Sequence, residues 1–271
     1  YLYLLDLANR SITKIHNFRE GMNNPLNMCK IKNMDNFDDM ICYGEYFSNS
    51  SKEEVNIYCS AMGNLEWKKI YTFPKGQINH IHSIVPDYYR NKVWILTGDF
   101  EGGAGIWYTN DNFKTVNKFL VGKQKYRSCA VFPIPQGLIY ATDTPLAENN
   151  IFMLNLEKNK YEIKKLYDLE GSCIYSTKIG KTMMFSTAVE GDSSLDLGIF
   201  NLISYRRGKG IKSWNSELVV GNYFDGFERI ALFKKDILPM GLFQYGTVVF
   251  PYDNNSNKNI ILYGYALKDI D

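Results

Sequence analysis

The chain has 271 residues, of which 45% are hydrophobic and 22% charged, and its formal net charge is +2. This balance is that of a globular protein, and it provides no strongly basic surface of the kind that nucleic-acid binding needs. The sequence contains no run of about 18 apolar residues. We therefore expect neither a nucleic-acid partner nor a membrane span.

The apolar pattern predicts short β-strands along the whole chain. In chain order, examples are YLYLLDL, SITKIHNF, KVWILTGD, GIWYTND, GLIYATD, NIFMLNL, KTMMFSTA and TVVFPYD. Gly, Asn, Asp and Lys separate these runs, and no stretch of about twelve residues has a helical period. The aromatic share of 15% also favours sheet. Short strands with regular turns are typical of a sandwich, a barrel or a propeller.

An internal repeat decides among these architectures. Residues 78–99 and 125–143 each read as an apolar strand that ends near a proline, a turn, and a second strand that ends in a small residue and Asp. Two further strands follow each segment, so the unit has four strands and about 45–50 residues. This pattern predicts an all-β propeller of four-stranded blades, built as one domain over residues 1–271.

Four cycles look complete, and a fifth is partial. The complete cycles begin near Leu26, Ile78, Lys125 and Ser172, and the last of them ends near Val220. A fifth begins near Phe227, and the first residues supply two further strands. Because an open edge strand invites pairing with other chains, the ring must close. The extra N-terminal strand favours six blades, and five is the alternative.

Five cysteines are present, and none forms a CxxC pair: Cys29, Cys42, Cys59, Cys129 and Cys173. Most lie in apolar runs, which is typical of free buried thiols in a reducing compartment. We therefore expect a cytoplasmic protein. The chain begins at Tyr1 rather than Met and has no signal-peptide pattern at its start, so we also expect that residues have been removed from it or left out.

Two turn motifs carry a resemblance to a known family. Thr109, Asp111 and Thr115 fit the frame S-x-D-x-G-x-T-W, and Ser60 and Trp67 fit a second copy of it. A longer, weaker version runs from Ser204 to Trp214. These frames resemble the Asp boxes of the sialidase-like propellers, which lie between the third and fourth strands of a blade.

The resemblance implies the fold and leaves the activity open. In an Asp box the Asp and Ser or Thr side chains satisfy backbone groups of the turn, and the aromatic residue packs between blades. A sialidase also needs three arginines and a Tyr-Glu pair. Arg127, Arg229 and Arg19 are the candidate arginines, but no Tyr-Glu pair can be placed, so the resemblance does not extend to sialidase activity.

Polar residues recur where the second strand of each cycle ends. Glu45, Asp99, Asp143 and Glu190 stand at equivalent points, so a propeller would bring them to one mouth of its channel. The first strands add His80 and Arg127, which align with each other. His82 lies two residues after His80 and so faces the same side of a strand. Arg229 holds a similar place in the last cycle.

These residues predict a carbohydrate site. Carboxylates serve as acid and base at a glycosidic bond, His exchanges protons near neutral pH, and Arg binds carboxylates. We assign catalysis to Asp99, His80, Asp143 and Glu190, and substrate binding to Arg127, His82, Glu45 and Arg229. The structural alternative is that each carboxylate satisfies turn backbone. No third metal ligand is evident beside the His pair, so we expect no metal and no cofactor.

Two functions follow from this reading. The first is a glycoside hydrolase or lyase that acts on a bacterial surface or capsular oligosaccharide or polysaccharide. The second is a non-catalytic propeller that binds a glycan or a protein partner. Carboxylates about 5–10 Å apart around a cleft favour hydrolysis, whereas carboxylates bonded to turn backbone favour binding or a purely structural role.

Overall fold

The computed structural model describes residues 1–271 except 158–159, 193–202, 251–258 and 269–271. The regular secondary structure of the described part consists of β-strands and one short 3-10 helix, η1, at Gln124–Tyr126. None of the helical structure in this part is long and apolar enough to cross a membrane. The chain divides into two compact units, Tyr1–Tyr126 and Arg127–Asp271, called here the N-terminal and C-terminal units. That they form one domain stays a prediction.

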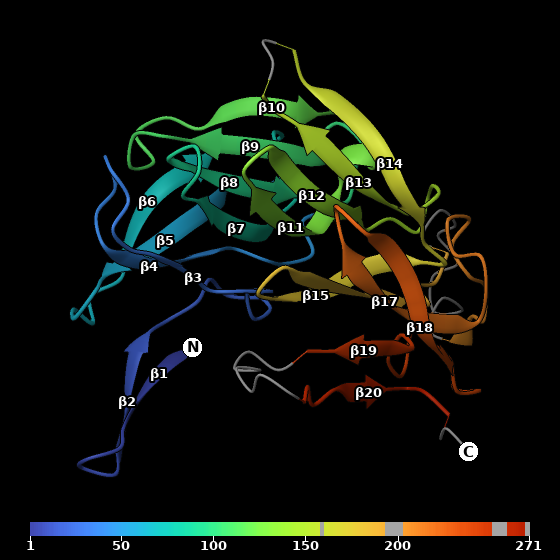
Figure 1. Cartoon of the computed structure of the whole chain (residues 1–271). Coiled ribbons are helices and arrows are strands. Elements are labelled where there is room, and N and C mark those ends of the chain that lie inside the picture. Colours follow the sequence, from blue (N-terminus) through green and yellow to red (C-terminus); the bar gives the residue numbers. More distant parts are fainter. Residues whose placement is uncertain (158–159, 193–202, 251–258, 269–271) are drawn as a thin grey trace. The chain divides into compact units, whose positions relative to one another are not determined.

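The N-terminal unit contains two four-stranded antiparallel sheets and a hairpin (Figure 1). The hairpin consists of β1 (Leu2–Asp6) and β2 (Ser11–His16). The first sheet has β3 (Cys29–Ile31), β4 (Met40–Gly44), β5 (Val55–Ala61) and β6 (Lys68–Phe73), in that order. The second has β7 (Ile81–Asp87), β8 (Lys92–Thr97), β9 (Gly105–Thr109) and β10 (Asn117–Val121).

The C-terminal unit repeats the pattern. One sheet has β11 (Ser128–Ile134), β12 (Gly137–Thr142), β13 (Asn150–Asn155) and β14 (Glu162–Asp168). The other has β15 (Ser172–Ile179), β16 (Thr182–Ala188), β17 (Asn215–Asn222) and β18 (Gly226–Lys234). A short pair, β19 (Thr247–Val249) and β20 (Tyr263–Tyr265), joins this sheet through one pairing, Ala188 with Thr247.

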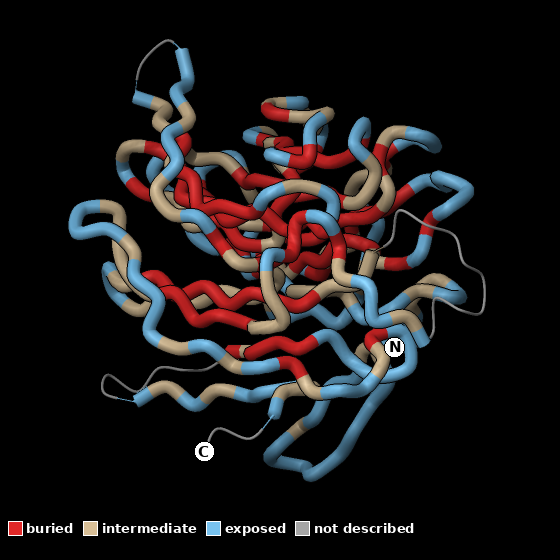
Figure 2. The backbone as a smooth tube through the Cα atoms, turned by 90° about the vertical axis from the view of Figure 1, so that its right-hand side faces the viewer, coloured by how far each residue is buried: buried red, intermediate tan, exposed pale blue. Residues whose placement is uncertain are grey.

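Each unit has its own core, where apolar faces of its sheets meet. In the N-terminal unit Val55, Ile57, Ile84 and Ile95 belong to one buried cluster. In the C-terminal unit Ile139, Ile151 and Phe185 form the corresponding cluster. Figure 2 shows that buried residues concentrate in the strands and that most connecting loops are exposed. This is the outcome expected for short apolar strands joined by polar turns.

The predicted four-strand repeat is confirmed for the sheets that follow Leu26, Ile78 and Lys125. The end of the fourth cycle, predicted near Val220, is wrong. Residues from Phe227 onward belong to β18, which pairs with β17 in the same sheet and does not begin a new one. The reason is the connection from β16 to β17, which occupies residues 189–214 and moves the last two strands later in the chain.

The turn between β9 and β10 has the hydrogen bonds that the motif predicts. Thr109 Oγ1 donates to Asp111 Oδ1 at 2.9 Å, and the Thr115 backbone N–H donates to the same oxygen at 3.0 Å. Ser60 likewise donates to the Asn64 carbonyl in the β5–β6 turn. The Ser204–Trp214 frame lies between β16 and β17, so it is not an equivalent turn and that assignment is wrong.

Asp111 is expected to give a small, acid-sensitive contribution to stability. Slight burial raises its pKa, but hydrogen bonds from Thr115 and Thr109 outweigh this, and the net pKa is below the usual value. The contribution is therefore present above the usual Asp pKa and lost as the pH falls through the lowered one. Urea unfolding of wild type and Asp111→Asn should differ by about 1 kcal/mol or less at neutral pH and converge in acid. A constant difference would contradict this.

Candidate functional site

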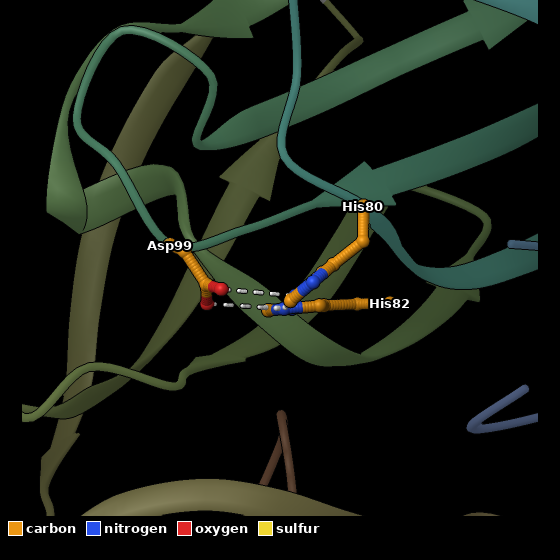
Figure 3. Close-up of side chains that lie close together, drawn as sticks. All are labelled: His80, His82 and Asp99. Atoms are coloured by element: carbon orange, nitrogen blue, oxygen red, sulfur yellow. Dashed lines mark hydrogen bonds and ion pairs between the residues drawn. The ribbon is translucent and has the colours of Figure 1, made fainter. Parts of the chain in front are cut away.

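Backbone irregularities at the start of β7 and the end of β8 create the candidate site. His80 immediately precedes β7, and His82 is its second residue. Ile81 pairs with Thr97 and Ser83 with Leu96, so His82 is the extra residue of a β-bulge. A bulge bends a strand and re-aims its side chains. Asp99 follows β8 by two residues, and Figure 3 shows its carboxylate facing both imidazole rings.

The three side chains meet closely. His80 Nε2 lies 3.0 Å from His82 Nε2 and 3.3 Å from Asp99 Oδ2, while His82 Nε2 lies 3.9 Å from Asp99 Oδ1. The side chains of His80 and His82 are only 5% and 2% exposed, whereas that of Asp99 is 37% exposed. The cluster therefore has a buried nitrogen side and a solvent-accessible oxygen side. One ligand atom from each of the three residues lies within 4.8 Å of the others.

A backbone carbonyl sets the tautomer of His80. Its Nδ1 lies 3.0 Å from the carbonyl oxygen of Phe47. Because a carbonyl can only accept, Nδ1 carries the proton and Nε2 of the neutral ring presents a lone pair to the cluster. The Tyr46 ring packs against His80 with a centroid distance of 4.3 Å. This arrangement, with the outer ring nitrogen bonded to a carbonyl, is the usual support of a metal-binding histidine.

Asp99 is held in an uncommon backbone conformation. Its φ is 73°, in the left-handed region that non-glycine residues rarely adopt. Asn79 Nδ2 donates to Asp99 Oδ2 at 2.5 Å, and Gln124 Nε2 donates to the Asp99 carbonyl at 3.0 Å. A Cβ on the preceding Gly98 would lie 2.0 Å from the His82 ring, so only glycine leaves room for this imidazole. Strained backbone held by several contacts is common at functional sites.

The C-terminal unit has the same three positions with different side chains. Arg127 precedes β11, Cys129 is the extra residue of a bulge in it, and Asp143 follows β12. Arg127 Nε lies 3.7 Å and Cys129 Sγ 3.2 Å from Asp143 Oδ2. The predicted alignment of His80 with Arg127 therefore holds in three dimensions. Here a cation and a thiol surround the carboxylate, so this cluster is not a second copy of the His site.

Glu45 uses its carboxylate within its own sheet. Its Oε2 accepts from the backbone N–H of Asn56 at 2.8 Å and from the Asn56 side chain at 3.0 Å. Its Oε1 lies 3.3 Å from Arg19 Nε. The Glu45 backbone carbonyl does support the site, because it accepts from the Ile81 N–H at 3.0 Å. These contacts favour the structural alternative over substrate binding by Glu45.

Burial of Glu45 is expected to give stability a pH dependence opposite to that of Asp111. Burial raises its pKa, and the bonds from Asn56 and the charge of Arg19 offset this only in part. A carboxyl with a raised pKa stabilises the fold most below its usual pKa, and this benefit is lost as the pH rises through the folded value. The stability of wild type relative to Glu45→Gln should therefore fall between acid and neutral pH in urea titrations. A rising difference would contradict this.

The two remaining predicted residues, Arg229 and Glu190, contact residues outside the His80 and Arg127 clusters. Arg229 is on β18, the outermost strand of its sheet and not a first strand, and its Nη1 lies 3.8 Å from Glu170 Oε1. Its predicted equivalence to His80 is wrong because the fourth cycle ends later than predicted. Glu190 follows β16 and is half-buried, and its carbonyl accepts from the Gly208 N–H. Convergence of all the predicted carboxylates at one channel mouth stays a prediction.

Several supporting residues were missed from the sequence. Asn79 and Gly98 adjoin His80 and Asp99, so their positions were a usable signal. The role of the Phe47 backbone carbonyl could not be predicted from the sequence, because every residue has a carbonyl. We expected no metal site because the sequence offered no third ligand beside the two histidines. The fold supplies such a residue, because Asp99, which follows β8, lies close to His80 and His82.

No protein-family model matches the chain, and neither does any curated protein. Among solved structures, an oligogalacturonate lyase in complex with manganese matches with a TM-score of 0.51 at 11% identity, covering 98% of this chain and 71% of that one. A complex of an S. cerevisiae Dbp5 variant bound to Nup159, a Gle1 variant, IP6 and ADP matches with a TM-score of 0.35 at 9% identity, covering 79% and 68%.

The lyase is a propeller enzyme, and its likeness together with the four-stranded antiparallel sheets confirms the predicted fold class. This chain is an all-β protein of the propeller type. The number of blades and the closure of the ring stay predictions. The sialidase-like Asp-box family is not confirmed, although the β9–β10 turn has the hydrogen bonds of such a motif.

Proposed function

We propose that this protein is a metal-assisted polysaccharide lyase whose ion is held by His80, His82 and Asp99. The observation that carries the proposal is the convergence of two imidazole nitrogens and one carboxylate. Two nitrogens and an oxygen suit a divalent transition-metal ion that keeps open positions. The similarity to a manganese-bound oligogalacturonate lyase supports both the choice of ion and the choice of a glycan that contains uronic acid.

The spacing of the three donors fits an ion. Ligands about 2.1 Å from a metal lie about 3.0 Å apart at a right angle and about 3.4 Å apart at a tetrahedral angle. His80 Nε2 lies 3.0 Å from His82 Nε2 and 3.3 Å from Asp99 Oδ2, which is within this range, while the 3.9 Å distance from His82 Nε2 is to the other Asp99 oxygen, Oδ1.

Each residue has a defined task. His80 presents Nε2 because its Nδ1–H is bonded to the Phe47 carbonyl, and Asn79 orients the Asp99 carboxylate. A divalent ion here would neutralise a uronate carboxylate and so acidify the neighbouring C–H. In the elimination, a base removes that proton, the C–O bond to the next sugar breaks, and a carbon–carbon double bond remains. No water is consumed.

Lyase chemistry is favoured over hydrolysis by the surroundings of Asp99. Hydrolysis needs two carboxyl groups that flank the bond. In the N-terminal unit the other predicted carboxylate, Glu45, faces Asn56 and Arg19. A bacterial surface or capsular polysaccharide with uronic acid units is the substrate class that we propose. A binding module without turnover is the alternative, and the assay below separates the two.

The test is a digest of uronate-containing oligosaccharides with the full chain, with Mn²⁺ or with a chelator. We expect ultraviolet absorbance from the new conjugated double bond with Mn²⁺ only, and no product from a neutral glycan of equal length. His82→Ala should lose turnover, whereas Arg229→Ala, outside the cluster, should keep it. New reducing ends without absorbance would indicate a hydrolase, and binding without product would indicate a binding module; either result contradicts the lyase.

A further inference from the structure

Three of the five cysteines form one row across a sheet of the N-terminal unit. Cys29 on β3 is directly opposite Cys42 on β4, and Cys42 is directly opposite Cys59 on β5. Directly opposite residues of antiparallel strands point to the same face, so all three thiols share one side. All three adjoin the same apolar cluster. Cys42 is thus a central thiol with a thiol neighbour on each side.

Backbone hydrogen bonds show which kind of pair each neighbour makes. The Met62 N–H donates to the Asp39 carbonyl, and the Glu45 N–H donates to the Asn56 carbonyl. These opposite residues are therefore hydrogen-bonded pairs of the β4–β5 ladder. Hydrogen-bonded and non-hydrogen-bonded pairs alternate along an antiparallel ladder. Cys42 lies three residues from both Asp39 and Glu45, which is an odd number of steps along the ladder. Its pair with Cys59 is therefore non-hydrogen-bonded.

In both kinds of pair the two Cα atoms are close enough for a disulfide bond. In a non-hydrogen-bonded pair such as Cys42 and Cys59 the Cα atoms are about 4.5 Å apart. The amide groups of Cys42 then face β3, so its pair with Cys29 is hydrogen-bonded, with Cα atoms about 5.5 Å apart. Disulfides span Cα separations of about 4.4–6.8 Å. Either bond can therefore form without moving a strand.

The three cysteines of the row differ in their exposure to solvent. Cys59 is half-buried, Cys42 is fully buried and Cys29 is 5% exposed. A hydrogen bond with Cys29, together with burial, holds the pKa of Cys42 well above its usual range. Burial also raises the pKa of Cys59, which Asp38 raises further and Lys68 lowers. An oxidant therefore meets Cys59 first, because it is the most exposed thiol of the row, and the raised pKa of Cys42 keeps that thiol protonated at neutral pH.

We propose that Cys59, Cys42 and Cys29 form an oxidisable relay, in which Cys59 takes up a peroxide-class oxidant and Cys42 closes the disulfide. The Cys59 thiol reacts with hydrogen peroxide to give a sulfenic acid and one water. The Cys42 thiol attacks this sulfur, releases a second water and forms the Cys42–Cys59 disulfide. The Cys29 thiol can then attack Cys42, transfer the bond inward and restore the Cys59 thiol. This relay does not depend on the proposed lyase activity.

The experiment is a peroxide time course on the full chain at several pH values, with free thiols alkylated and linked peptides identified by mass spectrometry without reduction. We expect a Cys42–Cys59 or Cys29–Cys42 link that forms faster as the pH rises. Cys59→Ser should slow link formation by about tenfold or more, because the half-buried entry thiol is gone. Cys29→Ser should leave only the Cys42–Cys59 link.

Cys173→Ser, in the C-terminal unit, is the matched control and should leave the rate unchanged. Circular dichroism checks that each variant is folded, and the half-buried Cys59 is the mildest of the three positions to change. Equal rates in wild type and Cys59→Ser would overturn the relay. So would links made to Cys129 or Cys173, or oxidation that stops at single thiols without any link in the row.

Discussion

Gly98→Ala is expected to weaken binding of Mn²⁺ by about 10–100-fold and to destabilise the protein by about 1–3 kcal/mol. A Cβ at this position would lie 2.0 Å from both Cε1 and Nε2 of His82. The imidazole is buried and cannot simply swing into solvent, so the ring must leave the cluster or the backbone must shift. Either movement separates His82 from His80 and Asp99. Isothermal titration with MnCl₂ and urea unfolding measure the two effects.

Gly102→Ala is the matched control for this prediction. A Cβ there would lie 3.6 Å from the Phe100 ring, an ordinary contact, and residue 102 is in the loop that follows Asp99. The control should bind Mn²⁺ as wild type does and should change stability by about 0.5 kcal/mol or less. Equal affinity in wild type and Gly98→Ala would contradict the placement of His82 in the ion site.

Asp87→Ala is expected to cost about 3–5 kcal/mol of stability. Asp87 is the last residue of β7 and its side chain is fully buried; its Oδ2 accepts from Trp94 Nε1 at 2.9 Å and from Arg90 Nη1 at 3.0 Å. Its Oδ1 accepts from the Tyr89 N–H at 3.0 Å. Removing the carboxylate takes the acceptor from the Trp94 and Tyr89 N–H donors and removes one ion-pair partner of Arg90. Chemical denaturation followed by tryptophan fluorescence measures the loss.

Two further variants sharpen this result. Asp87→Asn keeps one acceptor oxygen but loses the charge, so its cost should be intermediate. Asp35→Ala removes an exposed aspartate of the same unit and should fall within about 0.5 kcal/mol of wild type. A cost for Asp87→Ala no larger than that for Asp35→Ala would show that the buried carboxylate does not organise the turn.

The strand pattern could be predicted because it depends on local sequence. Apolar runs of the right length, turn residues and the repeat place most strands of three sheets, since each four-stranded unit has nearly the same connections. The fourth sheet was only partly predicted, because residues 189–214 separate β16 from β17. A repeat read by spacing cannot anticipate such an insertion, and Arg229 was misplaced for that reason.

The site could be predicted in part, because the repeat aligns strand ends. His80, His82 and Asp99 were all selected from the sequence, and the structure brings them together. Their role as an ion site was not predicted, because Asp99 reaches the histidines only through a left-handed backbone and a neighbouring glycine. For Glu45 the contacts favour the structural alternative, for a related reason. Its bonds to Asn56 are contacts between strands, which spacing along the chain does not reveal.

The most direct test of the central claim is the number of Mn²⁺ ions that the full chain binds. We expect wild type, after chelator treatment and titration, to bind one Mn²⁺ per chain, and a His80→Ala, His82→Ala double variant to bind none at the same concentration. Arg127→Ala, which leaves the three ligands intact, should keep the ion. Binding that is absent in wild type, or unchanged in the double variant, would contradict the assignment of the His80, His82 and Asp99 cluster as a metal site.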